Sequence, residues 1–400
     1  MTTTINNEHK KLNVPNLRFP EFQGEWEEER LSDIADLYKG TGISKDQLSE
    51  EGEPCILYGE LYTKYKSETI KEVISKTSID NAKLVRSKAN DVIIPCSGET
   101  VEDIATARCI LKDNILLGGD LNIIRLRGYD GSFMSYQLNG KRKYDIAKVA
   151  QGVSVVHLYG EHLKRVKTIN PCLEEQKKIA SLLALLDERI ATQNKVIDKL
   201  QSLIKGISNQ LLYANHGISV RLGDILIERS ERTKENNQHE VLSSTVKGIF
   251  TQREYFSKDI ASENNVGYKV VRLQDVVLSP QNLWMGNINY NNKFDIGIVS
   301  PSYKVFSIAV GYDKEYIAAL LKTHRALYNY MLVSEQGASV VRRNLNMEEF
   351  EQLTFKLPPI ERQQKIGHTI SKLKLRLDLT YNQKAMYEEQ KQYLLRHMFI

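Results

Sequence analysis

The chain repeats itself at long range, and this repeat constrains its fold more than any other feature of the sequence. EEQKKIA begins at Glu174 and returns as ERQQKIG at Glu361, 187 residues later. Three other phrases recur in the same order: RLSDIADL as RLGDILIE, NDVIIPCSG as QDVVLSPQN, and AQGVSVVHL as EQGASVVRRNL. Loop insertions change the spacing of such phrases without changing their order. We therefore interpret the chain as two similar halves, each a globular unit followed by a regular segment.

The regular segment is predicted to be a long helix in both halves. In the first half, steps of four and three alternate along one seam, as in a heptad repeat: Ile179, Leu183, Leu186, Ile190, Gln193, Ile197, Leu200, Ile204, Ile207 and Leu211. The offset of 187 residues carries this register without a gap onto Ile366, Ile370, Leu373, Leu377, Thr380, Lys384, Tyr387, Lys391, Leu394 and Met398. Two unrelated amphipathic helices would not share a register over ten positions. The lysines weaken the second seam, so its last turns either pack loosely or face a partner subunit.

The length of the first helix predicts how the two helices are arranged. A helix from about Glu174 to Tyr213 would be roughly 60 Å long at 1.5 Å per residue. The second globular unit begins near its far end, and the second helix buries its seam only by packing back along the first. We expect an antiparallel coiled coil with a globular unit at each end and approximate two-fold symmetry. The expected boundaries are 1–172 and 216–357 for the globular domains, and 173–215 and 358–400 for the helical regions.

Each globular unit is predicted to be mixed α/β. DVIIP, NIIRL, VVRL, DVVLS and YKVFSI have the length and the β-branched content of strands. FMSYQLNG with KRKYDIAKVA, and KEYIAALLKTHRALYNYML, are the helix candidates.

Composition narrows the class of protein. Hydrophobic residues make up 41% of the chain and charged residues 26%, as in ordinary globular proteins. The chain has no apolar run of membrane-spanning length and no visible secretory signal. Four scattered cysteines without a CxxC pair favour a reducing cytoplasm over a zinc site or a disulfide framework. The net charge of +5 permits a local basic surface but does not establish nucleic-acid binding.

The sequence offers no catalytic constellation. GxxxxGK[ST], HExxH and GxSxG motifs are missing, as is the Asn- or Asp-Pro-Pro-aromatic tetrapeptide of an amino-methyltransferase. Glu175-Gln176-Lys177 has the residue types of a nuclease site. It lies in the first turn of a predicted helix, where acidic residues favour the helix dipole, so we interpret it as structural. No metal site is predicted.

Polar loops recur in both halves. KGTGISK, YGELYTKYK and SGETVED belong to the first, and SSTVKG, QNLWMGNINYNN and QGASVVRRN to the second. Amide, hydroxyl and guanidinium groups read base edges in duplex DNA, while Lys and Arg hold phosphates. Taken singly, each loop is explained by ordinary surface polarity. Their recurrence favours DNA contact.

The chain resembles the specificity subunit of type I restriction-modification systems over essentially its whole length. The resemblance rests on LRFPEFQGEWEEERLSDI (Leu17 to Ile34), PCLEEQKKIA and PPIERQQKI, with IIPCSGET, GGDLNIIRL, AQGVSVVHL, IVSPSYKVF and QGASVVRRNL. It implies two target recognition domains, each reading half of a bipartite double-stranded DNA site, and a coiled coil that sets the spacer. It also implies two methylation subunits and restriction/translocase subunits as partners. These would use S-adenosylmethionine, ATP and Mg, while the chain itself binds no cofactor and is not catalytic. The alternatives are the specificity subunit of a related methylase-nuclease system and a fused enzyme fragment.

By this resemblance, the recognition loops of each domain supply the DNA contacts. In the first domain the candidates are Lys39, Thr41, Tyr58, Tyr62, Lys64, Ser97, Glu99, Thr100, Gln151, Ser154 and His157. In the second they are Ser244, Thr245, Lys247, Gln281, Asn282, Trp284, Asn287, Gln336, Ser339, Arg342 and Arg343. Because the loops differ between the domains, the two half-sites should differ in sequence.

Overall fold

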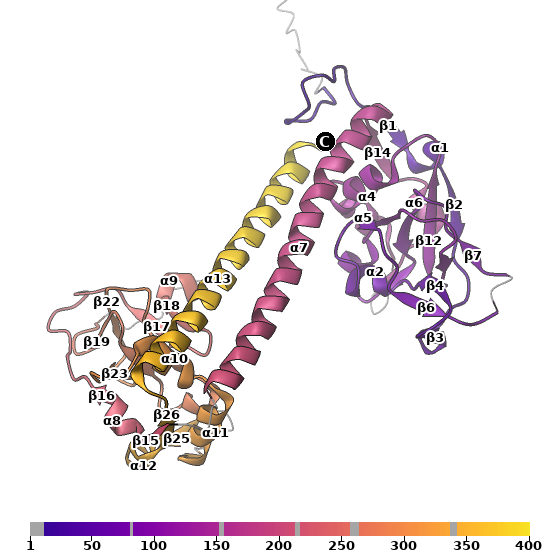
Figure 1. Ribbon diagram of the computed structural model, residues 1–400. Helices are drawn as coiled ribbons and strands as arrows, with labels where there is room; N and C mark the ends of the chain where they lie inside the picture. Colours follow the sequence, from indigo (N-terminus) through magenta and orange to yellow (C-terminus); the bar gives the residue numbers. More distant parts are fainter. Residues whose placement is uncertain (1–11, 81–82, 152–155, 213–216, 257–263, 337–341) are drawn as a thin grey trace, which may run out of the picture. The chain divides into compact units, whose positions relative to one another are not determined.

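The structure is a computed structural model that describes residues 12–80, 83–151, 156–212, 217–256, 264–336 and 342–400. The chain divides into two compact units (Figure 1): the first combines Met1–Asn194 with Asn382–Ile400, and the second is Lys195–Tyr381. Two long helices, α7 (Leu173–Leu212) and α13 (Ile360–His397), each contribute one part to each unit. The predicted long helix after each globular half is therefore confirmed.

The first unit is built around a five-stranded sheet with the order β2-β12-β8-β10-β5. The central strand β8 (Val92–Pro95) is buried at all four positions, which explains why DVIIP reads as a continuous apolar run. Helix α4 (Gly131–Asn139) packs against β8 and β10. The other strands of this sheet are β2 (Ala35–Lys39), β5 (Thr69–Ile70), β10 (Arg108–Ile110) and β12 (Leu121–Leu126).

A second five-stranded sheet of the first unit has the order β3-β6-β4-β11-β7. Its strands are β3 (Leu48–Ser49), β4 (Glu53–Ile56), β6 (Ser75–Thr77), β7 (Val85–Arg86) and β11 (Leu116–Leu117). Two-stranded pairs join β1 (Glu27–Arg30) to β14 (Lys167–Asn170), and β9 (Ser97–Gly98) to β13 (Val156–His157). The short helices are α1 (Leu31–Ile34), η1 (Lys45–Gln47), α2 (Glu60–Thr63), α3 (Val101–Ile104), α5 (Lys143–Val149) and α6 (Gly160–Leu163).

The second unit contains a four-stranded sheet with the order β16-β23-β20-β21. Its strands are β16 (Leu226–Glu228), β20 (Val276–Leu278), β21 (Ile288–Tyr290) and β23 (Lys304–Ile308). Four antiparallel pairs accompany it: β15 (Ile218–Arg221) with β26 (Thr354–Leu357), β17 (Leu242–Thr245) with β18 (Gly248–Thr251), β19 (Lys269–Arg272) with β22 (Ile296–Val299), and β24 (Ser334–Gln336) with β25 (Arg343–Leu345). The helices are α8 (Leu222–Ile225), α9 (Gln252–Tyr255), η2 (Leu283–Met285), α10 (Lys314–Leu320), α11 (His324–Leu332) and α12 (Met347–Gln352).

The two units share one plan, as the internal repeat predicts. Each begins with a strand that pairs with the last strand before its long helix, β1 with β14 and β15 with β26. A short helix and an edge strand follow, and the sheet order β2-β12-β8-β10 corresponds to β16-β23-β20-β21. The mixed α/β class and the repeated domain are thus confirmed.

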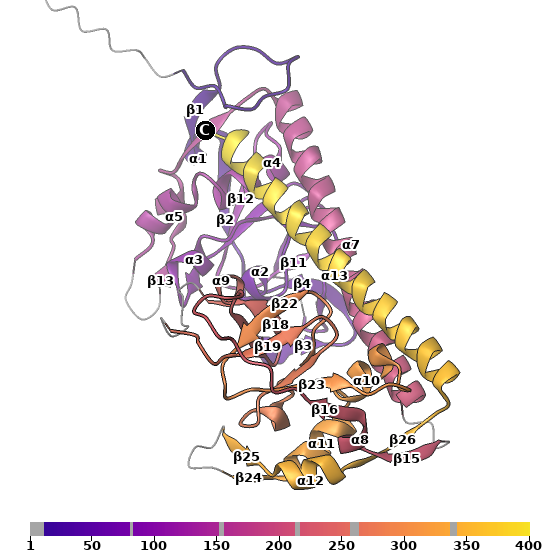
Figure 2. The ribbon, with the colours of Figure 1, turned by 90° about the vertical axis from the view of Figure 1, so that its left-hand side faces the viewer.

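The heptad seam is buried within each unit. In the first unit, Ile179 and Leu183 of α7 share a core with Leu394 and Met398 of α13. In the second unit, Ile207 of α7 packs against the core that contains Ile366 and Ile370 of α13. In each unit, therefore, the start of one helix lies beside the end of the other, so the pairing is antiparallel (Figure 2).

The last turns of α13 pack tightly. The expectation that the seam lysines loosen this end of the helix or turn it toward a partner subunit is therefore wrong. Lys391 is buried, and its ammonium lies 2.5 Å from a Glu68 oxygen and 2.6 Å from an Asp187 oxygen. Phe399 stacks on Phe133 with ring centroids 5.1 Å apart. The lysine on the seam is therefore a buried ion-pair member, and the end of α13 belongs to the core of the first unit.

One predicted helix is two. KEYIAALLKTHRALYNYML divides into α10 and α11 because the Thr323 side chain accepts a hydrogen bond from the Ala326 backbone N–H and caps a new helix. The four cysteines are free thiols, and of them only Cys172 is exposed. Among the described residues, no helix is long and apolar enough to cross a membrane.

Candidate nucleic-acid interface

Three candidate residues of the first unit meet where β9 pairs with β13. Ser97 lies opposite His157 in this pair. Gln151 and His157 exchange two backbone hydrogen bonds, of 2.9 and 2.7 Å. The side chains of Gln151 and His157 are exposed, whereas Ser97 is buried. Residues from two distant segments of the chain are thus held together at one polar edge.

Two of the three tyrosines of YGELYTKYK, Tyr58 and Tyr62, lie near the acidic residues that follow β9. Burial raises the pKa of Tyr62, and the neighbouring Tyr58, Asp103 and Glu99 raise it further. Glu99 is exposed, while the Thr100 hydroxyl accepts a 3.1 Å hydrogen bond from the Asp103 backbone N–H and caps α3. Tyr58, Tyr62 and Glu99 therefore belong to the same surface, and Thr100 fixes the helix beside them.

The remaining candidates of the first unit have supporting or separate positions. The Lys64 ammonium donates to Glu60 at 2.6 Å and to Ser75 at 2.8 Å, so it steadies the turn that carries the tyrosines. Thr41 accepts a hydrogen bond from the Val85 backbone N–H at 3.3 Å. Lys39 is exposed and lies 3.9 Å from Asp120. Ser154 lies outside the described residues, as does Ser339 of the second unit.

In the second unit, four candidates meet around η2 and the β24–β25 pair. The Arg343 backbone N–H donates to the Gln281 carbonyl at 3.1 Å, and Gln336 lies opposite Arg343 in the strand pair. The Arg343 guanidinium lies over the Trp284 ring, 5.2 Å from its centroid, and donates to two backbone carbonyls. Arg343 is therefore engaged in holding the loop, whereas the neighbouring Arg342 is exposed.

Two other candidates, with Asn289, form the support of the β17–β18 turn. Ser244 and Asn287 are buried and joined by a 2.9 Å hydrogen bond, and Asn289 donates to the Ser244 hydroxyl at 2.8 Å. Because these polar groups are satisfied inside the unit, they shape the turn. Thr245 and Lys247 lie on it, and Lys247 is exposed. Asn282 adjoins this network, because its carbonyl accepts a 3.2 Å hydrogen bond from the Asn287 backbone N–H.

Sequence reasoning missed two lysines beside this network. Lys322 donates to Asn289 Oδ1 at 2.6 Å, and it shares the lining of one cavity with Lys374. Lys322 falls where a continuous helix is predicted, and Lys374 lies between seam positions, so neither stands out in the sequence. The signal in the sequence is the asparagine-rich segment 287–292, which contains Asn289.

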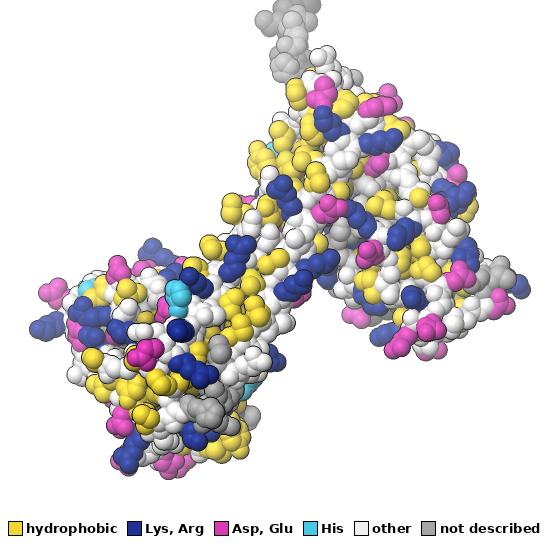
Figure 3. Space-filling model, viewed as in Figure 1, with side chains coloured by type: hydrophobic (Ala, Val, Ile, Leu, Met, Phe, Trp, Pro, Cys, Tyr) yellow, Lys and Arg dark blue, Asp and Glu magenta, His cyan; other side chains and the backbone are white. Residues whose placement is uncertain are grey.

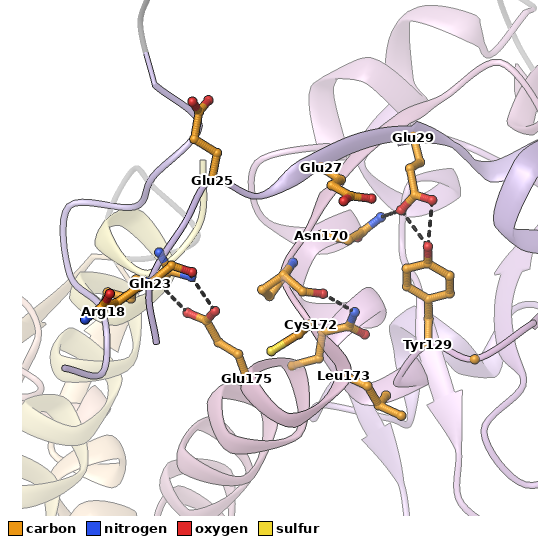
Figure 4. Close-up of a pocket in the computed structure, with 13 residues that line it drawn as sticks. Arg18, Gln23, Glu25, Glu27, Glu29, Tyr129, Asn170, Cys172, Leu173 and Glu175 are labelled. Atoms are coloured by element: carbon orange, nitrogen blue, oxygen red, sulfur yellow. Dashed lines mark hydrogen bonds and ion pairs between the residues drawn. The ribbon is translucent and has the colours of Figure 1, made fainter. Parts of the chain in front are cut away.

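A larger cavity of about 410 Å³ lies in the first unit at the start of α7 (Figure 4). Glu25, Glu27 and Glu29 line it, and Arg18 pairs with the buried Glu175 at 2.8 Å. Its acidic lining is the wrong sign for phosphate. Glu175 thus has a structural partner, in agreement with the interpretation of Glu175-Gln176-Lys177. Among the described residues, no group of three His, Cys, Asp or Glu side chains could hold a metal ion.

Comparisons with known proteins agree on one family. The model of the type I restriction modification DNA specificity domain matches residues 23–202 and 219–387. The type I restriction enzyme MjaVIII specificity subunit of Methanocaldococcus jannaschii is 28% identical over 196 residues, which are 49% of this chain and 43% of that protein. The chain thus spans less than half the length of that relative.

Two further similarities extend over nearly the whole chain. The putative type I restriction enzyme MjaX specificity subunit of the same organism is 22% identical over 434 aligned residues, covering 97% of this chain and 96% of that protein. The crystal structure of the type I restriction-modification S subunit from M. genitalium is similar in fold, with a TM-score of 0.66, 16% identity, and coverage of 97% of this chain and 99% of that one.

Proposed function

Since the chain belongs to the type I restriction modification DNA specificity family, we propose that each of its two globular units reads one half of a bipartite DNA site. One observation carries this proposal. In both units the polar loop that follows the matching central strand, β8 or β20, lies beside a backbone pairing that includes a glutamine: one glutamine bridges His157 of the β9–β13 pair, and the other lies in the β24–β25 pair. Gln151 and Gln336 are these glutamines, and both are exposed. An exposed amide suits adenine in the major groove.

The two units present different side chains to DNA, so their half-sites differ. The first unit offers Tyr62, Glu99 and His157, and the second offers Lys247 and Arg342. A carboxylate accepts from a cytosine amino group, whereas a guanidinium donates to guanine. A repeated fold with unlike loops therefore recognises an asymmetric sequence in two parts.

The long helices set the distance between the half-sites and dock two methylation subunits. Exposed apolar side chains on α13 support the docking of partner subunits, because they lie outside the heptad seam. They are Leu375 and Leu379 in the second unit and Met386 and Tyr393 in the first. Exposed apolar side chains also appear along the helices in Figure 3. Such residues mark surfaces for a protein partner.

The chemistry resides in the partner subunits. The chain recognises DNA and is not catalytic, in line with its family. Methylation subunits supply S-adenosylmethionine-dependent transfer to adenine N6, and restriction/translocase subunits use ATP and Mg. The complex acts in the cytoplasm, which suits four free thiols.

The test measures duplex binding by the chain assembled with its methylation subunits. Arg342→Ala and Gln336→Ala should each lower the affinity for the cognate duplex by about 10-fold and relax the preference at one base pair. Arg362→Ala is the matched control, because Arg362 is an exposed arginine in the first turn of α13 and belongs to none of the recognition loops. Wild-type protein that binds cognate and scrambled duplexes equally well would overturn the proposal.

A further inference from the structure

A small basic cavity of about 190 Å³ lies in the second unit between the sheet and α13. Lys322, which follows α10, and Lys374, on α13, both line it. Asn289 of β21 and Glu315 of α10 also line the cavity with polar groups. The cavity thus lies between α13 and the polar network that supports the β17–β18 turn.

The two lysines lack acidic partners at ion-pair distance. Among the residues that the structure describes, neither ammonium has a carboxylate oxygen within 4.0 Å. Lys322 donates only to neutral oxygens, to Asn289 Oδ1 at 2.6 Å and to the Val246 carbonyl at 3.4 Å. Glu315 accepts a 3.0 Å hydrogen bond from Ser371. Even with Glu315 counted, the lining keeps one positive charge in excess.

Burial lowers the pKa of both ammonium groups, although the Lys374 residue as a whole is exposed. Burial, and to a smaller extent the charge of Lys374, lower the pKa of Lys322 to about 8. Burial also lowers the pKa of Lys374, against the opposing influence of Asp378. An anion in the cavity would stabilise the charged form of both lysines, because it compensates for lost hydration and lies between two like charges.

The equivalent place in the first unit is internally balanced. The residue 187 positions before Lys374 is Asp187. Its carboxylate accepts from Lys391 at 2.6 Å, from Tyr136 at 2.7 Å and from Ser67 at 2.8 Å. The internal repeat therefore places an aspartate with its partners in one unit and a lysine facing a cavity in the other. The carboxylate at this position of the repeat in the first unit is replaced by a second cation in the second unit.

We propose that this cavity holds one phosphate of the DNA backbone, with Lys322 and Lys374 as its two cationic contacts. The inference rests on the proposed function, because it assumes that the second unit binds duplex DNA. Asn289 links Lys322 to the recognition turn: it accepts from Lys322 and donates to the Ser244 hydroxyl and to the Thr245 carbonyl, both at 2.8 Å. A phosphate held here fixes the position of the duplex relative to the turn, since backbone contacts set register while base contacts read sequence.

The variant that tests this is Lys374→Gln in the complex with methylation subunits. Among the described residues, Lys374 makes no hydrogen bond to the network, so its loss leaves the Asn289–Ser244 contacts in place. Lys372→Gln is the matched control, because Lys372 is an exposed lysine on the same helix outside the cavity. Affinity for cognate and scrambled duplexes is measured by fluorescence anisotropy between about 50 and 200 mM salt.

Loss of one phosphate contact has a distinct signature. Lys374→Gln should weaken both duplexes by a similar factor of about 5–10, and reduce the slope of log K against log salt by about 0.9. Lys372→Gln should leave both unchanged. An unchanged slope for Lys374→Gln overturns the inference, even if inorganic phosphate raises the unfolding temperature of wild type, because the site then takes a free anion only. Wild type without any site preference would instead refute the proposed function itself.

Discussion

The backbone N–H of Asp130 donates a 2.9 Å hydrogen bond to Oε1 of Gln176. Asp130 caps α4, and Gln176 lies in the first turn of α7, where its Nε2 donates to the Pro171 carbonyl at 2.8 Å. The glutamine is buried and satisfied on both sides. It therefore fastens the start of the long helix to the globular fold of the first unit.

The second unit repeats this contact in every detail. The Asp313 backbone N–H donates to Gln363 at 3.1 Å, and Gln363 donates to the Pro358 carbonyl at 2.8 Å. The repeated phrase around EEQ and ERQ thus encodes an attachment between helix and domain.

Gln176→Ala should lower the free energy of unfolding of the first unit by about 2–4 kcal/mol, because it leaves the half-buried Asp130 N–H and the buried Pro171 carbonyl without this partner. The matched control is Gln390→Ala, since Gln390 is an exposed glutamine on α13 in the same unit. Urea unfolding followed by Trp26 fluorescence, in a Trp284→Phe background, measures the difference. Equal losses for the two variants would show that the contact contributes nothing.

Lys391→Met should destabilise the first unit by about 3–5 kcal/mol near pH 7, because it leaves Glu68 and Asp187 buried without their cation. Burial already raises the pKa of Glu68, although Lys391 opposes this. In the variant the Glu68 carboxyl can be neutralised by protonation, so the loss should shrink as the pH falls. Lys384→Met, which removes a 3.6 Å surface pair with Glu388, should cost less than about 0.5 kcal/mol. A loss that does not depend on pH would indicate altered packing.

The pKa of Lys322 makes the stability of the second unit depend on pH. Its value of about 8 lies below the ordinary 10.5, so the unfolded chain binds more protons between these values. Stability therefore rises with pH across this window. Relative to Lys322→Met, wild type should gain stability from about pH 8 to pH 10, measured by urea unfolding with Trp284 as the reporter in a Trp26→Phe background. A constant difference between the two proteins would contradict the shifted pKa.

Removing one heptad from each long helix should shorten the DNA spacer. Lys195–Gln201 of α7 and Tyr381–Tyr387 of α13 are suitable segments, because Gln201 donates to the Tyr381 hydroxyl at 2.7 Å. Seven residues at 1.5 Å each correspond to about three base pairs. The methylated motif should keep both half-sites and lose about that much spacer. A five-residue deletion, which breaks the seam, should abolish methylation. An unchanged spacer after the heptad deletion would refute the proposal that the long helices set the distance between the half-sites.

The sequence predicted the elements that depend on periodicity and repetition. Both long helices follow from one seam, and the seam positions whose side chains are described are buried or half-buried. The break between α10 and α11 was missed, because the cap at Thr323 competes with an apolar pattern that continues through it. Lys391 was misjudged because its partner Glu68 lies 323 residues away in the chain.

The candidate site was predictable only as a set of loops. Pattern alone does not separate Ser244 and Asn287, which face inward and support a turn, from Lys247, which faces solvent. The pairing of Lys322 with Lys374 depends on a cavity formed by segments far apart in the chain. Contacts of this kind arise from tertiary packing and leave no local sequence signal.

The most direct test of the account is genome-wide mapping of N6-methyladenine in cells with and without this protein. We expect one methylated motif that disappears on deletion, made of two unlike half-sites separated by a spacer of fixed length. Methylation that is unchanged by the deletion, or that is lost from a single uninterrupted motif, would contradict it.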